Sequence, residues 1–400
     1  MKLSHRVLSA AESQTLAISA KAKAMRAQGI AVVNLSAGEP DFATPQIIKD
    51  AAIRALEEDF THYTPVPGIL PLRQVVAEKL CCENGIEGAT PETVVITAGA
   101  KHAIFCALLA ICNDGDEVLI PAPYWVSYPS IVRIAGAEPK VLETGEAQQW
   151  KITPKQLHSA ITPKTKCLIL NSPSNPTGVM YSPDELRALA EVLAQHDVFV
   201  ISDEIYEKIV FNKGIPHFSI GSIPEIASRV ITVNGLSKAY AMTGWRIGYA
   251  TATKAVIDQM KKLIGQSVTH ATSFVQKAAI VALQEAGEAV AQMRQVFERR
   301  RNLIVQLLNQ IPGISFPVPD GAFYVFVNLS ERLAAVGWSA EQFAHYLLEK
   351  YAVATVPGEA FGQPGCIRIS YATSDEQIRQ GIERLHQALE DVATGSAGEK

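Results

Sequence analysis

The chain has 400 residues, of which 48% are hydrophobic and 19% are charged, and its formal net charge is −4. This length exceeds one ordinary domain, and the composition excludes a disordered protein because it can supply a large apolar core. The charge shows no clustered basic face of the kind that nucleic-acid binding requires, and no apolar run approaches the roughly 20 residues that cross a membrane.

The six cysteines form no Cys-x-x-Cys pair, and several lie in apolar runs, which is typical of buried free thiols in a reducing compartment. The nine histidines include no His-Glu-x-x-His motif and no other metal-ligand spacing. The N-terminus lacks the apolar segment of a secretion signal. We therefore expect a soluble, cytoplasmic protein that binds no metal, nucleic acid or membrane.

Strands and helices alternate through the first 265 residues. Helical patterns are predicted over residues 13–28, 45–56, 70–84, 100–112, 183–196 and 255–264. Short apolar runs predict strands over residues 31–35, 94–97, 118–121, 167–171, 198–202 and 230–234. Continuous apolar strands separated by helices indicate an α/β protein with a mostly parallel sheet covered on both faces.

The segment Ala98-Gly99-Ala100-Lys101 is a turn of small residues between a predicted strand and a predicted helix. This arrangement points free backbone N–H groups at an anion. The chain has neither a Gly-x-Gly-x-x-Gly nor a P-loop motif, so a single phosphate is the modest interpretation. A tight turn without a ligand is the alternative.

Polar and aromatic residues follow the other predicted strands. Trp125, Asn175 and Asp203 stand at or just beyond three strand ends, and Lys238 follows the strand 230–234. Ligands of open α/β sheets bind at the carboxyl ends of the strands. The residues therefore predict one shared site, although each could also be an ordinary packing or surface residue.

Lys238 is the only lysine between Ser237 and Tyr249, and Arg246 follows it by eight residues. A lysine among apolar neighbours loses hydration, which lowers its pKa and frees the amine to form a Schiff base with a carbonyl. The alternative from spacing alone is a surface lysine after a turn.

The remaining chain predicts a smaller α+β part. One helical pattern runs from Ser273 to Gln310, and its Arg299-Arg300-Arg301 run is interpreted as a solvated face. Strands are predicted over 321–328 and 366–371, with helices over 339–351 and 374–392. The expected division is 1–45 (an N-terminal part of the small domain), 46–285 (the large cofactor domain), 286–392 (the small domain) and 393–400 (a flexible tail).

One cofactor, pyridoxal 5'-phosphate, suits an anion turn surrounded by these residue types: a lysine, a carboxylate, a tyrosine, an asparagine, a tryptophan and an arginine. The lysine can bind its aldehyde, and a carboxylate can keep its ring nitrogen protonated so that the ring accepts electrons. The hydroxyl and amide can donate to the ring oxygen, and the aromatic residue can stack on the ring. The arginine and the helix N-terminus can neutralise the phosphate.

Five motifs in order carry a family resemblance: residues 37–42 (Ala-Gly-Glu-Pro-Asp-Phe), 123–128 (Pro-Tyr-Trp-Val-Ser-Tyr), 175–178 (Asn-Pro-Thr-Gly), 202–206 (Ser-Asp-Glu-Ile-Tyr) and the Lys238 to Arg246 spacing. With them, residues 3–392 resemble the class I aminotransferases, particularly the bacterial and plastid-type branch of aspartate aminotransferases. The resemblance implies pyridoxal-phosphate fold type I, with a mostly parallel seven-stranded sheet between helices and a smaller α+β domain. It also implies a homodimer with shared active sites.

The resemblance also implies a role for each matching residue. Lys238 would bind the cofactor and carry the proton, and Asp203 would pair with the ring nitrogen. The other implied cofactor contacts are Tyr206 and Asn175 at the ring oxygen, Trp125 on the ring, Gly99, Ala100, Lys101, Ser237 and Arg246 around the phosphate, and Tyr63 at the partner subunit's phosphate. The implied substrate contacts are Arg368 at the α-carboxylate, together with Gly38, Lys101, Trp125 and Asn175.

Two departures bear on the expected chemistry. Gly235 stands where some branches have a serine that contacts the phosphate, and residues 266–273 lack the arginine that binds the distal carboxylate in another branch. Lys101 is the residue that would take over the distal carboxylate. The resemblance therefore implies transfer of the amino group of L-aspartate to 2-oxoglutarate by ping-pong chemistry.

Several alternatives stay open. They are an aromatic, prephenate or alanine-type aminotransferase, a β-lyase of the same fold, and a non-catalytic regulator that senses the cofactor. Residues 10–13 offer no cation to help bind prephenate. About 40 residues precede the cofactor fold, which leaves little room for the DNA-binding domain that such regulators carry.

Overall fold

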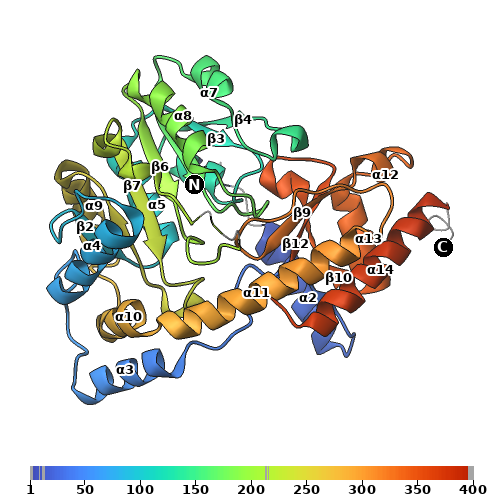
Figure 1. Ribbon diagram of the computed structural model, residues 1–400, viewed down its shortest axis with the longest axis horizontal. Coiled ribbons are helices and arrows are strands. Elements are labelled where there is room, and N and C mark those ends of the chain that lie inside the picture. Colours follow the sequence, from blue (N-terminus) through green and yellow to red (C-terminus); the bar gives the residue numbers. More distant parts are fainter. Residues whose placement is uncertain (1–2, 9, 11–13, 212–213, 215, 395–400) are drawn as a thin grey trace.

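The computed structural model describes residues 3–8, 10, 14–211, 214 and 216–394. Its main feature is a seven-stranded sheet with the order β2-β8-β7-β6-β5-β3-β4, on the left of Figure 1. The strands are β2 (Val94–Thr97), β3 (Glu117–Pro121), β4 (Glu138–Leu142), β5 (Thr165–Asn171), β6 (Phe199–Asp203), β7 (Val230–Gly235) and β8 (Gly248–Thr251). Only β8 runs antiparallel to its neighbours within this sheet, so the carboxyl ends of the other strands share one edge.

Helices cover both faces of this sheet because its strands are apolar on both sides. In β5, Cys167 and Ile169 pack with α5 (Ala100–Ile111), α6 (Tyr128–Ile134) and α9 (Lys254–Ser267), whereas Leu168 and Leu170 pack against α8 (Pro183–Ala194). A third cluster joins β2 to α3 (Gln46–Glu57), α4 (Leu70–Asn84) and α10 (Ser273–Glu285). The short helix α7 (Pro154–Ala160) lies beside α8.

Local signals explain several helix ends. The hydroxyl of Ser182 accepts the backbone N–H of Glu185, whose side chain accepts the N–H of Ser182, so a capping box starts α8. Gly85 ends α4 in a left-handed conformation, with φ of 68°, which glycine adopts without steric cost. The predicted bounds of α4 are confirmed for this reason.

The second part of the fold lies on the right of Figure 1 and combines both ends of the chain. Its strands are β9 (Tyr324–Asn328), β11 (Val356–Pro357) and β12 (Cys366–Ser370) in one antiparallel sheet, while β1 (Val33–Asn34) pairs with β10 (Val353–Ala354). Its helices are α2 (Gln14–Ala27), α11 (Gly287–Leu308), α12 (Ser330–Ala334), α13 (Ala340–Tyr351) and α14 (Asp375–Ala393). The short helix α1 (His5–Leu8) instead contacts α6 of the first part.

The predicted α/β class is confirmed, and three details differ. The long helix predicted over 273–310 is two helices, because the chain breaks at Ala286 between α10 and α11. Arg300 does not lie on a solvated face: it is 7% exposed and donates two hydrogen bonds to Asp41, of 2.7 and 2.8 Å. Strands β4, β8, β10 and β11 were not predicted. The expected tail lies largely outside the described residues, as do three of residues 10–13.

No helix in the part of the chain that the structure describes is both long and apolar enough to cross a membrane.

Candidate active site

A cavity of about 450 Å³ opens at the carboxyl edge of the large sheet. The turns after β2, β3, β5, β6 and β7 each contribute to its wall, as the sequence predicts. It brings together most of the predicted site residues: Gly38, Ala100, Lys101, Trp125, Asn175, Asp203, Tyr206, Ser237, Lys238, Arg246 and Arg368. Gly99 lies directly behind this wall, whereas Tyr63 lies outside it, 88% exposed, with its ring edge-on to His270.

Lys238 lies in the cavity just beyond the end of β7. Its Nζ atom donates a 2.5 Å hydrogen bond to the carbonyl oxygen of Gly38. Burial lowers the pKa of Lys238 to about 8, and the nearby Arg368 and Arg246 act in the same direction, while Glu39 and Asp203 oppose them. The side chain is therefore a far better nucleophile near neutral pH than an ordinary lysine.

Asp203 ends strand β6 and is 5% exposed. Its Oδ2 atom accepts a 2.6 Å hydrogen bond from the hydroxyl of Tyr128, and its Oδ1 atom accepts the backbone N–H of Ile205 at 3.3 Å. Burial raises the pKa of Asp203 to about 6, although both hydrogen bonds favour the ionised form. A buried carboxyl of this kind is prepared to share a proton with a ligand.

The turn after β2 forms an anion site. Gly99 has φ of 86°, and a Cβ atom there would lie 2.6 Å from Nη2 of Arg246, so only glycine fits. The first N–H groups of α5 lack partners within the helix, and Arg246 lies against them, with Nη2 donating to the carbonyl of Ala98. Lys101 adds a second cation, 4.9 Å from the centre of the Trp125 ring. Burial, and then Arg246, lower the pKa of Lys101.

Arg368 is a buried cation in strand β12, 2% exposed. It donates to Oδ1 of Asn175 at 2.9 Å and to the carbonyl of Ser36 at 2.8 Å, and its guanidinium lies 4.4 Å from the centre of the Tyr324 ring. These hydrogen-bond partners are neutral, and its Nε atom has none among the described residues. Burial lowers its pKa. A buried guanidinium with neutral partners favours an anionic ligand.

Tyr206 is also buried, and its hydroxyl shares a 2.9 Å hydrogen bond with that of Tyr324. Sequence reasoning missed Tyr324, although three aromatic residues (Phe323, Tyr324 and Phe326) lie in the strand predicted over 321–328. It also missed the roles of Tyr128 and Glu39. The carboxylate of Glu39 accepts a 2.7 Å hydrogen bond from Thr243 and is the acidic group that most opposes the low pKa of Lys238.

The cavity therefore offers one reactive amine, one buried carboxyl with a raised pKa, paired phenols, an indole and several cations. These groups match the aldehyde, the ring nitrogen, the ring oxygen, the flat ring and the phosphate of pyridoxal 5'-phosphate. The glycine at the anion turn supports this fit independently, because a Cβ atom would displace Arg246. The fold and the site thus define a pyridoxal-phosphate-dependent aminotransferase of fold type I.

The chain belongs to the family described as aminotransferase class I and II, whose model matches residues 30–385. It is 47% identical over 392 residues to an aspartate aminotransferase of Geobacillus stearothermophilus, covering 98% of this chain and 99% of the relative. It is 45% identical over 380 residues to an aspartate/prephenate aminotransferase of Cereibacter sphaeroides, covering 93% and 95% of the two chains. The solved aspartate aminotransferase of Thermus thermophilus with maleate matches with a TM-score of 0.92 at 42% identity, covering 97% and 100%.

Proposed function

We propose that this enzyme transfers the amino group of L-aspartate to 2-oxoglutarate, giving oxaloacetate and L-glutamate in two half-reactions of a ping-pong cycle. The observation that carries the proposal is the pair of cations Lys101 and Arg368, for which the described residues offer no acidic partner within ion-pair distance. A dicarboxylic amino acid supplies one carboxylate for each cation. The names of the relatives support the same substrate class.

In the proposed site, Lys238 would hold pyridoxal 5'-phosphate covalently, and Asp203 would pair with its ring nitrogen. When bound, the cofactor supplies an electron sink that stabilises the negative charge left at Cα of the substrate. The remaining proposed contacts are Tyr206 and Asn175 at the ring oxygen, Trp125 on the ring face, and Gly99, Ala100, Lys101, Ser237 and Arg246 around the phosphate.

Lys238 also serves as the general base. Once its amine is free, Nζ would take the proton from Cα of the substrate and deliver it to C4' of the cofactor. A base works best when its pKa lies near the working pH, and burial lowers the pKa of Lys238 to about 8. The contact with the carbonyl of Gly38 holds Nζ on the side of the cavity where the loop 36–42 lies.

Arg368 is proposed to bind the substrate α-carboxylate as a bidentate fork, with Asn175 beside it and the backbone of Gly38 closing over the substrate. Lys101 is proposed to bind the distal carboxylate.

The small domain would close over the filled site and exclude water. The proposed domains are those that the sequence predicts, with residues 1–45 and 286–392 in the small domain and 46–285 in the large one. The pairing of β1 with β10 supports this division.

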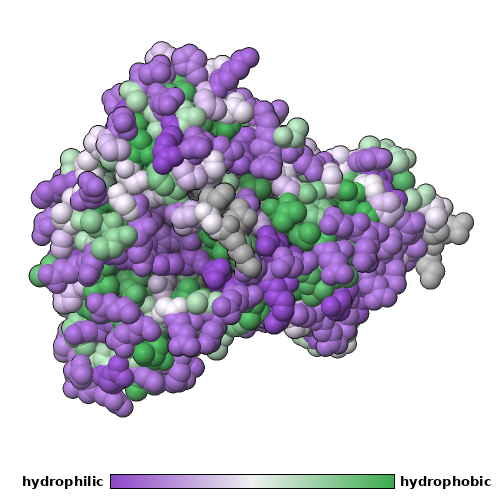
Figure 2. All heavy atoms as spheres, in the orientation of Figure 1, coloured by the Kyte–Doolittle hydropathy of each residue, from purple (hydrophilic) through white to green (hydrophobic). Residues whose placement is uncertain are grey.

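We also propose a homodimer in which Tyr63 reaches the phosphate of the cofactor in the partner subunit. Tyr63 is 88% exposed, and apolar side chains are also exposed on α3 (Ile53 and Leu56) and at the end of α9 (Val268). Figure 2 shows apolar atoms among polar ones at the lower left, where Figure 1 places α3 and α10. A second subunit would bury this surface.

We also propose a cytoplasmic location, which the six free cysteines support.

The test is a steady-state panel of kcat/KM across amino donors and keto acids, run on the parent enzyme and on Lys101→Ser. We expect aspartate and glutamate to lose about 10- to 100-fold in kcat/KM, the value of one charged hydrogen bond, while aromatic donors change little. Equal losses for all donors would mean that Lys101 serves only the phosphate. Prephenate belongs in the panel because one relative is named an aspartate/prephenate aminotransferase.

A further inference from the structure

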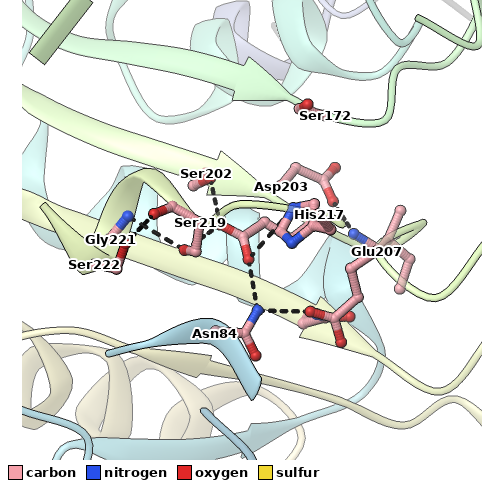
Figure 3. A network of polar contacts seen from close by, with 12 residues as sticks. Asn84, Ser172, Ser202, Asp203, Glu207, His217, Ser219, Gly221 and Ser222 are labelled. Atoms are coloured by element: carbon pink, nitrogen blue, oxygen red, sulfur yellow. Dashed lines mark hydrogen bonds and ion pairs between the residues drawn. The ribbon is translucent and has the colours of Figure 1, made fainter. Parts of the chain in front are cut away.

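A buried network of charged and polar side chains lies directly behind Asp203 (Figure 3). Successive side chains of a strand point to opposite faces, so Asp203 faces the cavity while Ser202 and Glu204 face away from it. Glu204 is 1% exposed, and its backbone N–H extends the pairing of β6 by donating to the carbonyl of Val233 at 2.9 Å. None of the cofactor or substrate contacts proposed above uses this network.

The carboxylate of Glu204 is held by donors whose orientation is fixed. Its Oε1 atom accepts hydrogen bonds from the hydroxyls of Ser202 at 2.8 Å and Ser219 at 2.6 Å, and its Oε2 atom accepts from Nδ2 of Asn84 at 3.1 Å. The hydroxyl oxygen of Ser219 already accepts the N–H of Gly221, so its proton points at Glu204. Three donors aimed at one side chain favour its ionised form.

The positive charge of Lys79, the lysine of this network, is paired with Glu207 and not with Glu204. Lys79 pairs with Glu207 and also donates to Oδ1 of Asn84, which orients the amide of Asn84. Burial alone would raise the pKa of Glu207, but the charges of Lys79 and then His217 lower this pKa to about 2. For Glu204, the remaining partner is Nε2 of His217, 3.8 Å from Oε2 and without a hydrogen bond. Burial raises the pKa of Glu204, and His217 opposes this.

The other titratable groups around the network are far less able to balance this charge. Burial raises the pKa values of Tyr240 and Tyr249, so both stay neutral. Glu83 and Lys208 pair with each other at the rim, where they are 45% and 31% exposed. The negative charge of Glu204 also acts on its neighbour in the chain: burial is the main cause of the raised pKa of Asp203, and Glu204 raises it further.

The cluster of Glu204, Glu207 and His217 also has ligand atoms within 4.8 Å of one another, a spacing that a metal ion could use. However, the amide hydrogens of Asn84 already point at both carboxylates, and the ammonium group of Lys79 contacts Glu207. A metal cation would meet these positive groups. The network is therefore better suited to hold a negative charge than to bind a metal.

We propose that Glu204 is a positioning residue for Asp203, whose buried carboxylate strengthens the hold of Asp203 on the proton at the cofactor ring nitrogen. The inference rests on the proposed pairing of Asp203 with that nitrogen. A fixed negative charge nearby makes every protonation in the site more favourable. Glu204 would thus help to keep the cofactor ring in its electron-accepting, protonated form.

The experiment is a spectrophotometric pH titration of the visible absorption band of the cofactor-loaded protein. The variants are Glu204→Gln, which keeps the shape and removes the charge, and Glu204→Asp, which keeps the charge and shortens the side chain. We expect Glu204→Gln to lower the midpoint by roughly 0.5–1 pH unit and Glu204→Asp to titrate closer to the parent. The control Glu83→Gln, at the exposed rim of the same network, should leave the midpoint unchanged.

An unchanged midpoint in Glu204→Gln overturns the inference, as does a larger shift in Glu204→Asp than in Glu204→Gln, since packing would then be the cause. If Glu204→Gln does not fold, Ser219→Ala replaces it: loss of one donor should shift the midpoint in the same direction, and no shift overturns the inference. The variant Asp203→Asn distinguishes failure of this inference about Glu204 from failure of the proposed pairing of Asp203 with the ring nitrogen. If it retains cofactor and titrates like the parent, the proposed pairing of Asp203 itself has failed.

Discussion

The low pKa of Lys238 predicts how fast the cofactor-free protein captures pyridoxal 5'-phosphate at different pH values. Only the neutral amine attacks an aldehyde, and a lysine becomes neutral as the pH rises through its pKa. With a pKa of about 8 instead of 10.5, roughly one Lys238 in ten is neutral at pH 7, against about one ordinary lysine in three thousand. Lys238 should therefore react about 300-fold faster than its ordinary pKa allows.

The assay follows the visible absorption band after the cofactor is mixed with cofactor-free protein between pH 6 and pH 10. The reaction of N-acetyl-lysine with the cofactor is measured at each pH and divided by the neutral fraction of that amine, so that it corrects only for titration of the cofactor itself. We expect the corrected rate to rise about tenfold per pH unit below pH 8 and then to level off. A rate that keeps rising through pH 10 would refute the argument that burial frees the amine. Lys238→Ala is the matched control and should form no borohydride-sensitive bond.

Three further predictions follow from the geometry. Arg368→Gln should raise KM for every amino donor by about 10- to 100-fold, because each carries an α-carboxylate; an effect confined to aspartate would contradict this role. Gly99→Ala should weaken cofactor retention in equilibrium dialysis, because its Cβ atom would meet Arg246 at 2.6 Å; unchanged retention would refute the tight fit. Arg300→Met should lower the free energy of unfolding by about 1.5–3 kcal/mol in urea titrations, whereas the exposed neighbour Arg299→Met should change it by less than about 0.5 kcal/mol.

The strands that position the site were predictable because their side chains are apolar on both faces. Strand β4 lacks this signal: it is an edge strand with the sequence Glu-Pro-Lys-Val-Leu, and all five of its residues are exposed or half-buried. Strand β8 (Gly-Tyr-Ala-Thr) is as short as β2 but lacks its run of β-branched residues, and its place between β2 and β7 depends on pairing between distant segments. The break at Ala286 also escaped prediction, since no proline marks it, although Gly287 follows directly.

For the site, strand ends indicated Lys101, Asp203 and Lys238 because the carboxyl ends of parallel strands converge. Arg368 followed only from the family resemblance, since it comes from the second part of the fold and no local pattern connects it to the large sheet. Gly38 lies in a Gly-Glu-Pro-Asp turn, which by itself indicates a backbone loop near a ligand, but its place at this site followed from the resemblance. The burial of Arg300 could have been found. It shares a helix face with the apolar Phe297 and Ile304, three residues before and four residues after it, both 1% exposed or less.

The charges of the cavity restrict what it can bind. Among the described residues that line it, four are basic (Lys101, Lys238, Arg246 and Arg368), and two are acidic (Glu39 and Asp203). A phosphate group at the α5 turn would engage Arg246, and covalent attachment would occupy Lys238. The two cations then left are Lys101, beside the indole of Trp125, and Arg368, buried among neutral groups. A monocarboxylic donor would leave the charge of Lys101 partly desolvated and without a partner, which is unfavourable. The two cations that would bind a dicarboxylic donor would therefore select against a donor with an uncharged side chain.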